Sequence, residues 1–93
     1  MQMTDRELLE LAAKAAGTEG VISVDHKFIW TKNATERWNP LQDDGDALRL
    51  AVKLYLWEPI RLAHRDITDA VDFYAATRRA IVRAAAEIGK AMP

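Results

Sequence analysis

The residues with the clearest chemical potential form an acidic cluster in the middle of the chain. Asp43, Asp44 and Asp46 surround Gly45, and carboxylates gathered in a loop are the ligands that Ca²⁺ and Mg²⁺ prefer. The cluster lacks both the alternating spacing and the downstream glutamate of an EF-hand. Acidic side chains also stabilise the first turn of a helix, where the helix dipole is positive. We therefore expect Asp43 to cap a helix without a metal, and we keep Asp44 and Asp46 as candidate hydroxyl-binding residues.

Motifs that support catalysis are missing from the sequence. His26 and His64 are the only histidines, and neither has the spacing of a zinc site, so we expect them in turns without a catalytic role. The absence of cysteine excludes disulfides, thiolate metal sites and a cysteine nucleophile. The four glycines are isolated, whereas phosphate-cradling loops need several together. The sequence therefore predicts no enzyme, no catalytic residue and no cofactor.

Aromatic and cationic side chains favour binding instead. The sequence contains three tryptophans; core anchoring accounts for one or two of them, since each buries a large apolar area. An exposed tryptophan beside Arg37 or Arg61 can stack on a base or anchor a protein partner. Arginines of the last predicted helix can bind a phosphate or an acidic partner, although a solvated helix face is the simpler explanation. Together with Asp44 and Asp46, the candidate binding residues are Trp38, Asn39, Trp57, Arg61, Arg78, Arg79 and Arg83.

The composition is that of one soluble domain, spanning residues 1–93. Apolar residues make up 49% of the chain and charged residues 29%, with a net charge of −1, as in typical globular proteins. This balance argues against disorder and against a nucleic-acid-coating protein, which needs a basic surface. The polar N-terminus is unlike a signal peptide, and no apolar run approaches a membrane span. We therefore expect a cytoplasmic protein that does not bind membranes.

The N-terminal half predicts one helix followed by a small sheet. Thr4 and Glu7 have the spacing of a capping box, and an apolar period of 3.6 residues predicts a helix over residues 5–16 that ends at Gly17. Beyond it, β-branched and aromatic residues alternate with polar turn formers, which is typical of a short antiparallel meander. The three expected strands are residues 21–24, 28–31 and 37–39.

The C-terminal half predicts two further helices separated by a strand. A helix is expected over residues 43–54, and the alternation in 55–63 predicts a strand, placed at a sheet edge because Pro59 lacks an N–H. The fold class is therefore α+β: three helices and a mostly antiparallel sheet in the order helix, two or three strands, helix, strand, helix. The expected core residues are Leu8, Leu11, Ala15, Val24, Ile29, Leu48, Ala51, Leu54, Ile60, Tyr74, Ile81 and Ile88.

The last predicted helix, over residues 69–92 with Thr68 or Asp69 as its cap, also bears on assembly. At 1.5 Å per residue it would be roughly 35 Å long, more than a small domain needs. Its many alanines spread small side chains around the helix, which allows a second helix to approach closely. We therefore expect a homo-oligomer, most simply a two-fold dimer built in part by this helix. The alternative is that the helix only packs within its own chain.

Two stretches resemble a known group of proteins. They are Trp38–Leu54, with the run W-N-P-L-Q-D-D-G-D-A-L-R-L-A-V-K-L, and the alanine- and arginine-rich Tyr74–Gly89. With the opening T-D-R-E-L-L at residues 4–9, they make the chain similar to a family of small uncharacterised bacteriophage and prophage proteins. The resemblance covers about half of the chain. It implies a phage or prophage origin and expression in the cytoplasm of a bacterial host, and it implies no enzyme activity.

Two kinds of function fit these observations. The first is a non-enzymatic phage accessory protein that binds a host or phage protein, which agrees with the surplus aromatic residues and the missing catalytic motifs. The alternative is a protein that binds or sequesters a nucleotide signal during the contest between phage and host. In that case arginines, aromatic rings and the acidic loop would contact phosphates, bases and ribose hydroxyls respectively. Binding of nucleic acid is the weaker option because the chain has almost no net charge.

Overall fold

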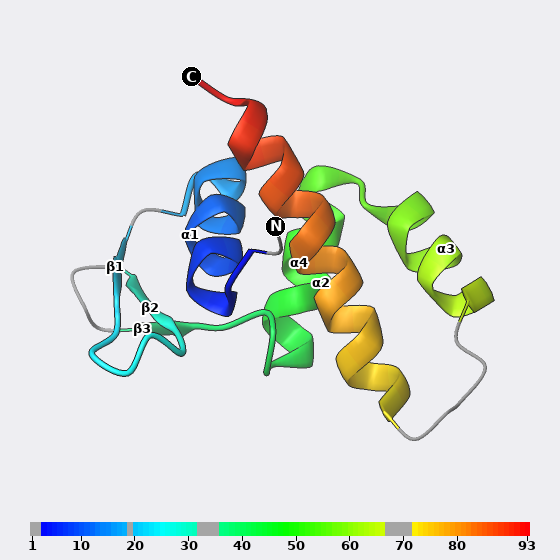
Figure 1. The fold of residues 1–93 in the computed structure, drawn as a ribbon, viewed down its shortest axis with the longest axis horizontal. Coiled ribbons are helices and arrows are strands. Elements are labelled where there is room, and N and C mark those ends of the chain that lie inside the picture. The colour runs from blue at the N-terminus through cyan, green and yellow to red at the C-terminus, as the bar shows by residue number, and fades with distance from the viewer. Residues whose placement is uncertain (1–2, 19, 32–35, 67–71) are drawn as a thin grey trace.

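The computed structural model describes residues 3–18, 20–31, 36–66 and 72–93, and within them the chain forms an α+β fold (Figure 1). This confirms the predicted fold class. No helix of the described ranges is long and apolar enough to cross a bilayer. The elements in chain order are α1 (Asp5–Ala16), β1 (Gly20–Ile22), β2 (Ile29–Thr31), β3 (Glu36–Trp38), α2 (Asp44–Leu54), α3 (Trp57–Asp66) and α4 (Phe73–Ala91).

The first helix has the ends that its sequence predicts. The Glu7 amide donates to Thr4 Oγ1 over 3.2 Å, and the Thr4 amide donates to Glu7 Oε1 over 3.2 Å. These two bonds form the capping box, which satisfies backbone N–H groups that the first turn leaves without a helical partner. Gly17 ends α1 with a φ of 69°, a left-handed conformation that glycine adopts without steric cost.

The two longest helices, α1 and α4, pack along each other at the centre of the molecule (Figure 1). A Cβ atom built on Gly89 would lie only 2.0 Å from the carbonyl oxygen of Leu11, so at this position the helices are too close to leave room for a side chain. Ala85 and Ala86 are fully buried within the same chain. Much of the small-residue surface on which we expected a dimer therefore packs inside the monomer.

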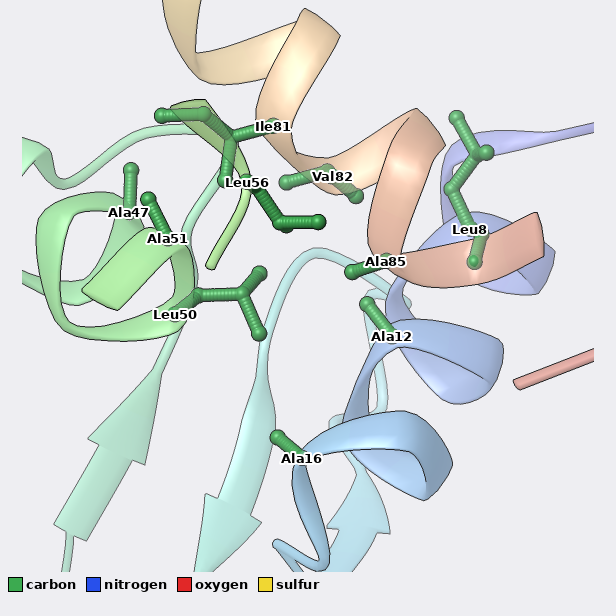
Figure 2. Close-up of a cluster of buried hydrophobic side chains, with 11 residues drawn as sticks. Leu8, Ala12, Ala16, Ala47, Leu50, Ala51, Leu56, Ile81, Val82 and Ala85 are labelled. Atoms are coloured by element: carbon green, nitrogen blue, oxygen red, sulfur yellow. The ribbon is translucent and has the colours of Figure 1, made fainter. Parts of the chain in front are cut away.

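The main core lies where α1, α2 and α4 meet (Figure 2). Leu8, Leu50 and Val82 are among its buried side chains, and Leu56 closes it from the segment after α2. Of the expected core residues, Leu8, Ile29, Ala51 and Ile81 are buried and Leu11, Ala15, Leu54 and Ile60 are partly buried. The prediction was wrong for four residues that are exposed: Val24, Leu48, Tyr74 and Ile88.

The three errors on α2 and α4 share a physical reason, which does not apply to Val24 because that residue is in no helix. The apolar stripes of α2 and α4 are wider than the surface that their neighbours cover, and a stripe alone does not tell which of its sides faces inward. On α2 the buried side contains Ala47 and Leu50, which turns Leu48 toward solvent. Val24 lies beyond the end of β1 and its side chain is fully exposed.

The prediction of a strand over residues 55–63 was also wrong, because Trp57–Asp66 forms helix α3. Pro59 is the third residue of α3, where its missing N–H is not needed for helical hydrogen bonding. Ile60 packs against the main core, and one turn later His64 Nε2 lies 3.0 Å from Thr77 Oγ1 of α4. His64 is therefore in a helix rather than a turn. A short apolar segment fits both the 3.6-residue period of a helix and the two-residue period of a strand. Packing against α4 favours the helix.

The last helix begins later than expected. Its N-cap is Asp72, whose carboxylate accepts a hydrogen bond from the Ala75 amide over 3.1 Å. Thr68 and Asp69, the caps predicted from sequence, lie outside the described residues. With 19 residues, α4 is about 28 Å long at 1.5 Å per residue, and it packs against α1, α2 and α3.

The meander β1–β2–β3 is antiparallel and covers the side of α1 that faces away from α4 (Figure 1). Ile29 is buried against Leu9 and Ala13 of α1. Side chains alternate between the faces of a strand, so the opposite face presents Trp30, with Val21 and Arg37 paired beside it in the register of the sheet. Of the described helices, α1 packs on the sheet at the Ile29 face, and residues at the starts of α1 and α2 border the opposite face near Phe28 and Arg37.

Two glycine substitutions test the close approach of α1 and α4. Gly89→Ala introduces a backbone clash, so we expect the free energy of unfolding to fall by about 1–3 kcal/mol. Gly45→Ala is the matched control, because its Cβ meets the flexible end of Arg49 at 3.3 Å and the Asp43 carboxylate at an ordinary 3.4 Å rather than backbone, and alanine is the better helix former by up to about 1 kcal/mol. Urea unfolding measures both changes. Equal stability of the two variants would contradict the close approach.

Candidate functional site

The corner between β3 and α2 brings together several residues that the sequence singled out. The Asn39 amide donates to Asp46 Oδ2 over 2.9 Å, and its side-chain Nδ2 donates to the Lys27 carbonyl over 2.6 Å. Asn39 Oδ1 in turn accepts from the Leu41 amide over 3.1 Å. Asp46 is buried and also accepts from Arg49 Nη2 over 2.7 Å. This network joins the β1–β2 loop, β3 and α2.

The acidic cluster serves the helix and its neighbours. Asp43 is the N-cap of α2, as predicted, and accepts from the Asp46 amide over 2.9 Å. Asp44 pairs with Arg78 Nη1 of α4 over 2.6 Å, while Arg78 Nε donates to the Leu41 carbonyl over 2.9 Å. The Arg78 side chain is only 17% exposed, so the residue ties α4 to the corner. Within the described residues, no group of three histidine or acidic side chains is placed to hold a metal ion.

The other candidate residues are dispersed over the molecule. Arg79 pairs with Asp5 of α1 over 2.8 Å, and Trp38 is partly buried against both core clusters. Trp57 and Arg61 lie on α3, away from the corner, and Arg83 is exposed on α4. The Arg61 guanidinium hydrogen-bonds Glu58, which lowers the pKa of that carboxyl and raises the pKa of Arg61. The predicted residues therefore form a structural corner and scattered surface positions, not one site.

One cluster that the sequence did not assemble lies on the open face of the sheet. The Arg37 guanidinium carbon is 4.7 Å from the Phe28 ring centroid and 5.7 Å from that of Trp30. The two rings meet edge to face, with centroids 4.9 Å apart and planes at 77°. We call these three residues the stacked face. The i, i+2 spacing of Phe28 and Trp30 already indicated a shared face, but the pairing of Trp30 with Arg37 required the sheet register.

Three shallow hollows of about 360, 390 and 420 Å³ border the stacked face, and all three are lined by Phe28 and Arg37. Other groups that line them include Lys27, Gln42 and Asp25. Asp25 accepts hydrogen bonds from the Ser23 hydroxyl over 2.6 Å and from the Lys27 amide over 3.1 Å. These bonds lower the pKa of the Asp25 carboxyl below its usual value.

A second exposed surface lies on α2. Leu48, Val52 and Tyr55 follow one another at helical spacing and are 57%, 53% and 82% exposed; we call them the α2 face. Tyr55 ends the helix with a φ of 56°. Glycine or asparagine usually occupies this left-handed position because a Cβ atom is strained there.

No known protein family, curated protein or solved structure matches this chain.

The corner yields a stability prediction. Asp46→Ala leaves the Asn39 amide without an acceptor in a partly buried place, so we expect it to cost about 1–3 kcal/mol of unfolding free energy. Asp43→Ala, which removes a helix cap and an exposed ion pair with Arg49, should cost about 0.5–2 kcal/mol. Urea unfolding of both variants tests this, with Glu87→Ala, at an exposed position of α4, as a control that leaves the midpoint unchanged. If Asp46→Ala behaved like Glu87→Ala, the corner would not be structural.

Proposed function

We propose that this chain is a non-enzymatic accessory protein of a bacteriophage or prophage that acts in the bacterial cytoplasm by binding a host or phage protein through the α2 face. The phage origin rests on the sequence resemblance described above. The absence of enzyme activity rests on the missing catalytic motifs. The protein partner rests on the chemistry of the α2 face.

The observation that carries the proposal is the conformation of Tyr55. A non-glycine residue in the left-handed region costs about 1–2 kcal/mol, and burial of the ring does not offset this cost, because the residue is 82% exposed. Glycine at this position would end α2 with less strain. The left-handed turn itself is structural, because it lets the Leu56 amide donate to the Ala51 carbonyl over 2.9 Å. The tyrosine side chain contributes nothing to that bond, and a residue type that violates a local preference without a structural gain is expected at a functional site. Tyrosine is also among the residue types that most often dominate protein interfaces.

The residues near Tyr55 on α2 also favour a protein-binding surface. Leu48 and Val52 extend the exposed apolar stripe along α2 for two turns. Single exposed apolar residues are ordinary, whereas contiguous ones mark surfaces that other proteins cover. Lys53 and Arg49 are exposed on the same helix and can provide the polar rim that such interfaces have.

Tyr55→Gly separates binding from folding. The change relieves the strained φ, so we expect the free energy of unfolding to rise by about 1 kcal/mol. It also removes the aromatic anchor, so retention of the partner should fall by about tenfold or more. The measurements are urea unfolding and capture of proteins from phage-infected bacterial cytoplasm by the immobilised chain. Leu48→Glu, which adds a charge to the same face, should also abolish capture.

The control is Val24→Glu, since Val24 is fully exposed but lies on the loop that connects β1 and β2, outside the α2 face. This variant should capture the same partner as the unmodified chain. Capture that is equal in the unmodified chain, Tyr55→Gly and Leu48→Glu would contradict the proposal. The proposal would also be contradicted if the unmodified chain captured no protein beyond those that the Leu48→Glu chain captures.

The homodimer predicted through the last helix is untested and stays a proposal. Because the outer side of α4 carries Arg83, Glu87 and Lys90, we now place the second copy on the more apolar α2 face, where the same variants test it. Light scattering at tens of micromolar distinguishes a mass of 10.5 kDa from twice that value. A dimer that Leu48→Glu dissociates would identify the second copy as the occupant of the α2 face and would overturn binding of a different protein there.

A further inference from the structure

The stacked face has the chemistry of a ligand site that is independent of the α2 face. We propose that it binds a single nucleotide, with the base packed against the Phe28 and Trp30 rings and the phosphate bound by Arg37. The contacts of Arg37, the hollows beside it and the charges around it support this assignment.

The first step is the state of Arg37. Its guanidinium lies against two rings, yet within the described residues it has no carboxylate or carbonyl acceptor. Contact with the two rings restricts the Arg37 side chain, so less side-chain entropy is lost when a ligand binds. The planar fork of guanidinium donors matches the geometry of a phosphate. Arg37 is therefore an anion-binding group held in place before the anion arrives.

The second step is the presence of aromatic surface next to this cation. Phe28 and Trp30 are only partly buried, so part of their ring surface is open to a ligand. Bases stack on such rings, and each stacked base contributes enough energy to anchor a ligand. Rings beside a free guanidinium therefore match a molecule that carries both a planar base and a phosphate.

The third step concerns polar groups at the edge of the stacked face. Gln42 lines two of the hollows, and its exposed side-chain amide forms no hydrogen bond within the described residues. An amide presents a donor and an acceptor together, which matches the edge of a base. The exposed Lys27 lines one of the same hollows and supplies a second cation for the phosphate.

The surrounding charges favour one nucleotide over a nucleic acid strand. Asp5, Asp25, Asp43 and Asp46 line the hollows that adjoin Phe28 and Arg37. A single phosphate can pair with Arg37 and Lys27, whereas the further phosphates of a longer polyanion would meet these carboxylates. The chain also carries a net charge of −1, whereas a strand needs an extended basic track. Each hollow of about 360–420 Å³ lies in the size range of small-molecule sites.

Calorimetric titration of the full chain tests the proposal. The probes are adenosine and guanosine 5′-monophosphates, adenosine without phosphate, inorganic phosphate, and a short single-stranded RNA. We expect at least one monophosphate to bind at submillimolar concentration, with adenosine and inorganic phosphate each weaker by about tenfold or more, because each probe lacks one of the two contacts. The RNA should bind no more tightly than its monomer.

Three substitutions locate the site. Arg37→Ala and Phe28→Ala should each weaken nucleotide binding by about tenfold or more, and Arg37→Lys should weaken it as well because lysine keeps the charge but not the planar stack. Lys90→Ala removes an exposed cation from the end of α4 and should leave affinity unchanged. Circular dichroism confirms folding of each variant; the exposed Arg37 variants keep the test valid if Phe28→Ala unfolds.

Four results would overturn the proposal. They are the absence of saturable nucleotide binding at millimolar concentration, unchanged affinity in Arg37→Ala, inorganic phosphate binding as tightly as the nucleotide, and RNA binding more tightly than the nucleotide. The third result would indicate a simple anion site, and the fourth a nucleic-acid surface.

Discussion

The close contact between α1 and α4 is the constraint on which the rest of this fold depends. Gly89 leaves no room for a side chain against the Leu11 carbonyl, and buried alanines on both helices let their backbones lie near each other. With its inner side filled by α4, α1 presents Leu9 and Ala13 outward, and the sheet packs on them through Ile29. A single helix pair thus supports the sheet on one side and the remaining helices on the other.

The hydrogen bonds around Asn39 fix the position of α2 relative to the sheet. Asp46 satisfies the Asn39 amide from inside the first turn of α2, and Arg78 connects the same corner to α4. A polar network that is buried must be fully paired, since any group left without a partner costs desolvation energy. No buried side-chain polar atom among the described residues lacks a partner. The stretch from Trp38 into α2 therefore acts first as a structural connection between the sheet, α2 and α4.

Two exposed residues, Tyr55 and Arg37, are not explained by contacts within the fold, and both have side chains suited to binding. Tyr55 holds a strained backbone conformation without burying its ring, and Arg37 lies on aromatic rings without an anionic partner in the described part of the chain. The two surfaces differ in kind, because the first is apolar and the second joins cation, aromatic and amide groups. A protein partner and a small anionic ligand are therefore not competing explanations for the same residues.

The sequence by itself determined the elements whose signals are local. The capping box at Thr4 and Glu7, the cap at Asp43 and the three strands are confirmed, since each depends on residues close together in the chain. The strand predicted for residues 55–63 was wrong, as was the placement of Val24, Leu48, Tyr74 and Ile88 in the core. Hydrophobic period and side-chain type do not show which surface of an element its neighbours will cover. From the sequence, Arg61 and Arg79 could equally bind a ligand or pair within the chain. The structure shows that Arg61 pairs with Glu58 and Arg79 with Asp5. Only the tertiary structure placed Arg37 over Phe28 and left Tyr55 in solvent, since both facts depend on strand register and helix packing, which bring together residues distant in sequence.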